Sequence, residues 1–139
     1  GKTLKSGTDY TVSYSSNKNV GTATVKITGK GQYGGTVSKT FKINPAKQKI
    51  QKLTAKSKAF FIDWAQKGSA TGYEVQYATN SKFTGAKKLD VANNKTDKMT
   101  ISKLSANKKY YVKVRSYTLV KGTKYFGEWS AVKSVTTKK

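Results

Sequence analysis

Apolar and polar residues alternate along the first 44 residues, with the period of two that is typical of β-strands with one covered face. Three runs of this kind have the apolar members Tyr10, Val12 and Tyr14; Ala23, Val25 and Ile27; and Val37, Phe41 and Ile43. Lys39 interrupts the apolar face of the third run. Glycines crowd residues 29–35, which favours a turn, and Pro45 disfavours further pairing. The pattern predicts a three-stranded meander over residues 1–44.

The same alternation continues through the rest of the chain. Its clearest runs are Phe60, Ile62 and Trp64; Tyr73, Val75 and Tyr77; and Tyr110, Val112 and Val114. Turn-forming residues separate these runs, and helical periodicity is disfavoured throughout. Short alternating strands at this spacing are typical of a β-sandwich. We therefore predict an all-β chain, with a second module over residues 45–139.

Several features of the second module together resemble a fibronectin type III domain. Trp64 lies where that family places a core tryptophan on its second strand, and residues 73–77 resemble the third strand. Leu104 precedes Tyr110 by six residues, as in the tyrosine corner of the family. The resemblance implies a fibronectin type III-like β-sandwich, in which Trp64 packs in the core and the Tyr110 hydroxyl closes a local backbone hydrogen bond.

The first 44 residues resemble bacterial immunoglobulin-like repeats. The resemblance rests on residues 7–12, 19–37 and 39–43, where glycines and alternating strands follow one another in an unusual order. Such repeats occur in tandem in secreted proteins of Gram-positive bacteria, and they normally begin with one or two further strands. It implies a partial immunoglobulin-like three-stranded β module over residues 1–44, with its N-terminal strands missing. Its unpaired edge is expected to invite intermolecular strand pairing.

Charge narrows the range of partners. The 139 residues carry 28 basic and six acidic side chains, for a net charge of +22, yet Arg115 is the only arginine. Nucleic-acid readers rely on the planar arginine fork, so specific nucleic-acid binding is not expected. Lysines alternating along strands form a solvated face, or they attract an anionic wall polymer or membrane surface. No apolar stretch is long enough to predict a transmembrane segment.

Catalytic chemistry lacks its usual residues. The chain has no His and no Cys, so the common general base, the thiolate nucleophile and the usual transition-metal ligands are missing. The six acids form no calcium-binding spacing and no local carboxylate pair, and no phosphate-loop or nucleophile-elbow motif is present. We predict that the chain is not an enzyme and has no catalytic, cofactor or metal site.

A possible ligand surface surrounds the predicted hairpin between the last two strands, whose tip is Lys121-Gly122. Its candidate residues are Tyr111, Arg115, Tyr117, Tyr125, Phe126 and Trp129. Exposed aromatic rings can stack on sugars, or they can pack against a neighbouring strand or module. We expect Trp129 to open the last strand, and we expect the Arg115 guanidinium to stack on its indole, as in cytokine-receptor fibronectin domains.

Two functions follow from these observations. The first is a non-catalytic extracellular module of a secreted or cell-surface bacterial protein, acting as a spacer or stalk that presents other domains. Its partners would be neighbouring modules of the same polypeptide. The alternative is a binding module for anionic cell-wall polymer or carbohydrate, through the Lys-rich surface and the exposed aromatics. An enzyme with carboxylates that meet only in space is the third reading.

Overall fold

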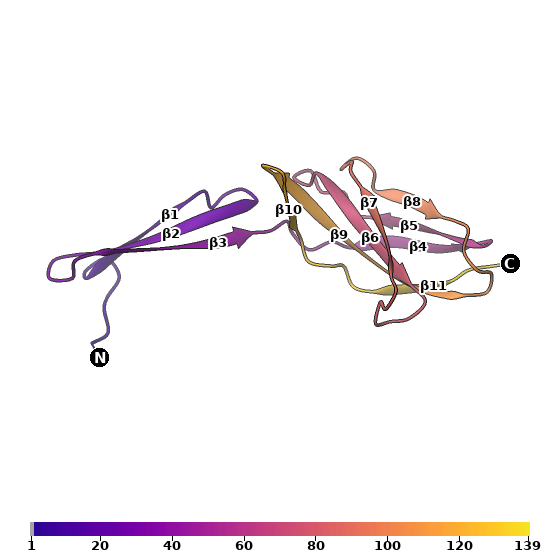
Figure 1. Cartoon of the computed structure of the whole chain (residues 1–139), viewed down its shortest axis with the longest axis horizontal. Coiled ribbons are helices and arrows are strands. Elements are labelled where there is room, and N and C mark those ends of the chain that lie inside the picture. Colours follow the sequence, from indigo (N-terminus) through magenta and orange to yellow (C-terminus); the bar gives the residue numbers. More distant parts are fainter. Residues whose placement is uncertain (1) are drawn as a thin grey trace. The chain divides into compact units, whose positions relative to one another are not determined.

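A computed structural model describes residues 2–139, and all the regular secondary structure in that range is β-strand (Figure 1). The chain divides into two compact units, Gly1–Asn44 and Pro45–Lys139. The prediction of an all-β fold is confirmed. The two units are described separately below.

The first unit is a three-stranded antiparallel meander. Its strands are β1 (Tyr10–Ser15), β2 (Gly21–Gly29) and β3 (Thr36–Ile43), in the spatial order β1-β2-β3. The register places Val12 opposite Ile27, and Ile27 opposite Val37. Because paired residues share a face, the apolar positions of all three strands lie on one side of this sheet.

The two faces of that sheet differ sharply in chemistry. The strand residues on the other face are Thr11, Ser13, Ser15, Thr22, Thr24, Lys26, Thr28, Thr36, Ser38, Thr40 and Lys42. On the apolar face, Val12, Tyr14, Ile27, Val37 and Phe41 are all exposed within this structure. The sequence pattern of a half-buried sheet is therefore present, and within residues 2–44 no further strand packs on its apolar face.

The second unit is a sandwich of two antiparallel sheets. One sheet has the order β4-β5-β8, and the other has the order β10-β9-β6-β7 with β11 also paired to β9. The strands are β4 (Ile50–Lys56), β5 (Ala59–Trp64), β6 (Gly72–Ala78), β7 (Lys87–Val91), β8 (Lys98–Ile101), β9 (Lys109–Val120), β10 (Thr123–Phe126) and β11 (Lys133–Thr136). The long strand β9 thus holds three partners (Figure 1).

The core lies between these two sheets. Trp64 on β5 and Tyr73 on β6 are fully buried, and their rings meet edge to face at 5.5 Å. The Tyr73 hydroxyl donates to the carbonyl of Asn94 and accepts from the Lys67 amide, so its polar end is satisfied inside the module. Removing an aromatic side chain from such a core costs about 3–5 kcal/mol. The expected core position of Trp64 is confirmed.

Tyr110 forms the predicted tyrosine corner. The ring is buried, and its hydroxyl oxygen accepts a hydrogen bond of 3.2 Å from the Ser105 amide. This bond fastens the loop before β9 to the strand itself. A neutral hydrogen bond of this kind contributes about 1 kcal/mol net.

The last strand is interrupted, and here one expectation is wrong. Trp129 does not open a strand, because β10 ends at Phe126 and β11 begins at Lys133. Between them the chain still follows β9: the Gly127 amide donates to Ser116, and the Ser130 amide donates to Val114. The predicted hairpin tip at Lys121-Gly122 is confirmed. Both residues have positive φ, 48° and 82°, as a type I′ turn requires.

Candidate functional site

Arg115 occupies the centre of the outer face of the larger sheet. Antiparallel pairing of β6 with β9 places Glu74 directly opposite it. Their side chains form an ion pair, with 3.0 Å between Arg115 Nη2 and Glu74 Oε1, and they are only 23% and 17% exposed. Partial burial strengthens such a pair relative to a fully solvated one.

Two aromatic rings lie against the same guanidinium. Its carbon is 3.7 Å from the centre of the Phe126 ring and 4.4 Å from the centre of the Trp129 ring. A planar guanidinium can stack face to face on a ring while its edge donates to a carboxylate, whereas an ammonium has no planar face to stack. The predicted stacking of Arg115 on Trp129 is confirmed.

Lys113 extends the arrangement by one further cation. Its Nζ atom is 4.6 Å from the Trp129 ring and 4.1 Å from the Phe83 ring. Side chains two positions apart on a strand are about 7 Å apart, which is room for one ring between them. Burial, and then the charge of Arg115, lowers the pKa of Lys113, while Glu74 acts in the opposite direction. We call Phe83, Lys113, Trp129, Arg115 and Phe126 the outer-face stack.

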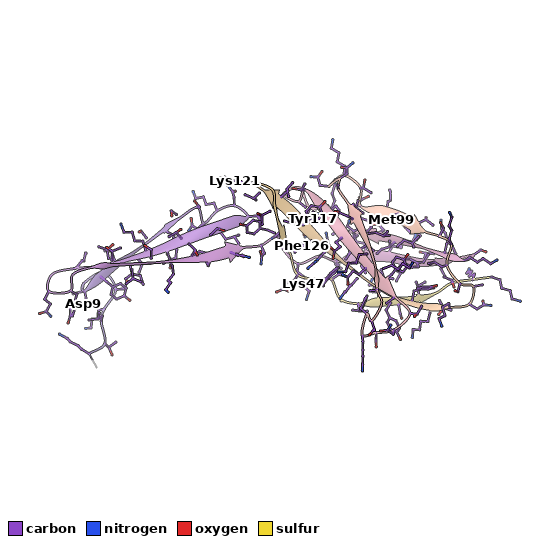
Figure 2. The ribbon with its side chains drawn as sticks, viewed as in Figure 1. Asp9, Lys47, Met99, Tyr117, Lys121 and Phe126 are labelled. Carbon is purple, nitrogen blue, oxygen red and sulfur yellow. The ribbon has the colours of Figure 1, made fainter. Side chains whose placement is uncertain are left out.

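A second set of contacts continues from Phe126. Tyr117 and Phe126, both labelled in Figure 2, meet edge to face with their ring centres 5.8 Å apart. Lys124 Nζ lies 4.1 Å from the centre of the Tyr117 ring. Lys124 also pairs with Asp90 on β7, and this hydrogen bond lowers the pKa of Asp90 and raises that of Lys124. Burial raises the pKa of Tyr117, and its hydrogen bond with Asp90 adds to the effect. Gly72 makes room for this ring, since a Cβ there would lie 2.7 Å from the Tyr117 hydroxyl.

A comparison with protein families decides the identity of the second unit. The model of the fibronectin type III domain matches residues 44–136. The chain belongs to the fibronectin type III family. Domains of this family are in general non-catalytic and typically extracellular, where they serve as spacer or binding modules.

Solved structures of fibronectin modules share the fold at low identity. The FN1-FN3 domains of chicken CNTN1 are 18% identical, with a TM-score of 0.60, and the match covers 89% of this chain and 45% of that one. The FN5 domain of Drosophila Lar is 22% identical, with a TM-score of 0.52, covering 68% of this chain and 98% of that one. A structure described as a myokine is 12% identical, with a TM-score of 0.57, covering 69% and 100%. A search of the curated proteins found no match.

The chicken match reaches beyond the fibronectin module. This chain spans less than half of the chicken structure, yet the match takes in 89% of this chain, whereas the second unit makes up only about two thirds of it. Residues of the first unit are therefore included in the match. At this identity the likeness concerns the fold alone.

The six candidate ligand residues of the fibronectin module do not form one exposed surface. The structure brings together Arg115, Tyr117, Phe126 and Trp129, but Tyr117 is 2% exposed, which contradicts a role in stacking on a ligand from solvent. Tyr125 pairs with Thr118, so it lies on the other side of the sheet from Phe126. Tyr111 shares the outer face but contacts Lys109, whose Nζ is 5.4 Å from its ring.

Several residues of this site were not identified as such from the sequence. Alternation along β9 puts Lys113 on the same face as Arg115, whereas Glu74 is placed opposite Arg115 only once the pairing of β6 with β9 is known. Phe83 comes from the turn between β6 and β7, where its backbone has a φ of 59°, and no periodicity points to it. Ser130 is buried, and its Oγ accepts from the Val114 amide in place of a ladder carbonyl. The Trp129-Ser130 pair was the only available signal for it.

The contacts of this site hold neighbouring strands and the segment after β10 together. No group of three or more possible metal-binding His, Cys, Asp or Glu side chains occurs among residues 2–139. Within the same residues, no helix is both long enough and apolar enough to cross a bilayer. The rings of the outer-face stack already contact the module's own cations. This arrangement fastens the interrupted segment between β10 and β11 onto β9.

Proposed function

We propose that the chain is a spacer segment of a larger extracellular protein, on the surface of a Gram-positive bacterium or secreted by it. In this role the fibronectin module and an immunoglobulin-like module formed by residues 1–44 present other domains, and their partners are neighbouring modules of the same polypeptide. The resemblance of residues 1–44 to tandem bacterial repeats supports this setting.

One observation carries the spacer role. The aromatic residues that would bind a ligand contact the module's own side chains instead: Trp129 lies against Lys113 and Arg115, and Phe126 lies against Arg115. Contacts of this kind increase the module's stability and leave less ring surface for a sugar. A sandwich whose surface aromatics hold its own segment between β10 and β11 onto β9 suits a spacer.

A second function is favoured by the charge alone. Only three salt bridges occur among residues 2–139, so most of the 28 basic side chains have no acidic partner. Such a field attracts anionic cell-wall polymer without a shaped site. Carbohydrate recognition by stacking is the less supported form of this alternative, because Tyr117 is buried and the Trp129 ring is occupied.

Retention on purified Gram-positive cell walls distinguishes the two functions. The spacer role predicts no retention at about 0.1 M NaCl, whereas attraction by the lysine field predicts retention that disappears between about 0.1 and 1 M NaCl, as the Debye length falls from about 10 to 3 Å. Retention that persists at high salt, and that Tyr111→Ala abolishes, would show a binding site and contradict the spacer role. Thr136→Ala on β11, where Thr136 is exposed, is the matched control and should behave as the unmodified chain.

A further inference from the structure

A hollow of about 410 Å³ opens in the fibronectin module, between the turn that joins β6 to β7 and the loop that joins β8 to β9. Two tyrosines form its inner side: Tyr77 is half-buried, Tyr110 is buried, and their ring centres are 6.2 Å apart. Small-molecule sites in proteins have volumes of about 300–1,000 Å³. The hollow is therefore large enough for one small ligand.

The turn that forms one wall is held by its own side chains. The Asn80 side-chain amide donates to the Thr84 carbonyl at 2.9 Å, and the Thr84 amide donates back to Asn80 Oδ1 at 3.1 Å. Phe83 of the same turn contacts Lys113 in the outer-face stack. These contacts fix the turn at both of its sides.

The loop that forms the other wall is fastened to three other parts of the module. The Leu104 amide donates to the Lys58 carbonyl at 2.9 Å, in the turn between β4 and β5. The Ser105 amide donates to the Tyr110 hydroxyl, and the Ser105 carbonyl accepts from Thr137 Oγ1 at 2.6 Å. Both walls are thus formed in advance, which lowers the cost of binding a ligand.

Lys87 lies on the inner face of its sheet. It pairs with Tyr77 across β7 and β6, so it shares the face that carries the fully buried Tyr73 and Val75. The residue is exposed, because it stands at the open side of the hollow. An inward-pointing lysine also discourages pairing at a sheet edge, but that role needs no second cation and no hydroxyl groups beside it.

The lining supplies many donors and no acid. Beside Lys87 it contains Lys103, and neither lysine takes part in the salt bridges found among residues 2–139. None of the described residues that line the hollow is Asp or Glu. Hydroxyl groups come from four further lining residues, Thr79, Thr84, Ser102 and Ser105. Two ammonium groups among hydroxyls are complementary to a phosphate or carboxylate group.

The tyrosines add an apolar surface that still donates hydrogen bonds. Burial raises the pKa of Tyr77, and Tyr110 adds to the effect, so the Tyr77 hydroxyl keeps its proton at neutral pH. The Tyr110 hydroxyl accepts from the Ser105 amide, so its own proton can be donated elsewhere. A ring surface beside hydroxyl donors suits the C–H face and the hydroxyls of a sugar.

We infer that this hollow binds an anionic sugar unit, a hexose with a phosphate or carboxylate group, whose charge faces Lys87 and Lys103 and whose ring lies against Tyr77. The site has no residue in common with the outer-face stack. The inference goes beyond the spacer role and does not depend on it, since a module that spaces other domains can hold one sugar unit weakly.

NMR spectroscopy of the isotope-labelled full chain tests the inference, because each backbone amide reports whether a ligand binds near it. Glucose 6-phosphate is added at about 0.15 M NaCl, where the Debye length is about 8 Å and the lysine field is largely screened. We expect saturable shifts confined to residues 79–87 and 102–110, with a dissociation constant of about 1–10 mM. Shifts spread over lysines of the whole module, or no saturation by about 50 mM, would overturn the inference.

Further ligands separate the parts of the inference. Glucose lacks the charge and inorganic phosphate lacks the ring, so each should bind at least about fivefold more weakly than glucose 6-phosphate. Equal binding of glucose would contradict recognition of the anion, and equal binding of inorganic phosphate would contradict recognition of the sugar. Glucuronate distinguishes the charged groups: tighter binding than glucose 6-phosphate indicates a carboxylate ligand, and weaker binding indicates a phosphate ligand.

Two charge-matched variants on the same strand locate the site. Lys87→Gln removes the inward cation and should weaken binding of glucose 6-phosphate at least about fivefold. Lys88→Gln removes the next cation, which pairs with Gln76 on the opposite face, and it should change the dissociation constant less than about twofold. Both lysines are exposed, so each variant should fold. Equal effects of the two variants would show general attraction by charge and would contradict a site in the hollow.

Discussion

At the residue level, Arg115 explains why a chain with 27 lysines has a single arginine. Its guanidinium contacts Phe126 and Trp129 and donates to Glu74 in the same arrangement. A lysine at this position could keep the charge, but its ammonium has no planar face to stack between two rings. The requirement for arginine is therefore geometric, and it applies at this one position.

We predict that Arg115→Lys lowers the free energy of unfolding of the fibronectin module by about 1–2 kcal/mol. The midpoint of urea denaturation, followed by tryptophan fluorescence, measures this change. In a double-mutant cycle with Trp129→Leu, the double variant should lose less free energy of unfolding than the two single variants lose together. The reason is that each single substitution already removes the same contact. Additive effects, or an unchanged midpoint in Arg115→Lys, would show that the stack contributes nothing.

Single residues also show how far the sequence predicts this structure. The places of Trp64 and Tyr110 follow from alternation and from family spacing, because core positions are set by periodicity. The burial of Tyr117 does not follow, since it depends on Phe126, Lys124 and the missing side chain of Gly72, which meet only in the folded module. Contacts made across strands and turns are not encoded in any local pattern.

At the level of elements, side chains tie together strands that do not pair with each other. β7 and β10 lie at the two ends of the spatial order β10-β9-β6-β7, and the ion pair of Asp90 with Lys124 spans the two strands between them. Tyr117 on β9 hydrogen-bonds to the same carboxylate. The interruption between β10 and β11 is thereby offset by contacts on the outer face.

This link predicts a specific dependence of stability on pH. The pKa of Asp90 is lowered in the folded module, so its contribution is present above the unfolded pKa of about 4 and is lost as pH falls through the folded pKa. The difference in urea midpoint between the unmodified chain and Asp90→Asn should therefore shrink on acidification from about pH 6 to pH 2. A difference that is constant over this range would show that the folded pKa of Asp90 is not lowered.

At the scale of the whole molecule, charge dominates. The net charge is +22, and only three salt bridges offset it among the residues that the structure describes. Self-repulsion of this kind keeps a protein soluble but destabilises the compact state. The alternating lysines thus lower the free energy of unfolding, and the buried core must offset this loss.

We predict that added salt stabilises the fibronectin module. The temperature of unfolding should rise between about 0.02 and 0.5 M NaCl, because screening of the lysine field outweighs screening of a few ion pairs. Differential scanning calorimetry measures this change. A temperature of unfolding that falls with salt would mean that the ion pairs contribute more than the repulsion costs.

The position of β9 in the sequence has a consequence for how the module forms. β9 pairs with β6, β10 and β11, yet it comes after β4 to β8 in the chain. During synthesis from the N-terminus, the apolar surfaces of Trp64 and Tyr73 stay uncovered until residues 109–120 have left the ribosome. Pairings between such distant segments close slowly, on the order of milliseconds to seconds for sandwiches. The module therefore becomes stable late and in one step. A chain that ends before β9 lacks the strand that pairs with β6, β10 and β11, so it cannot form the sandwich.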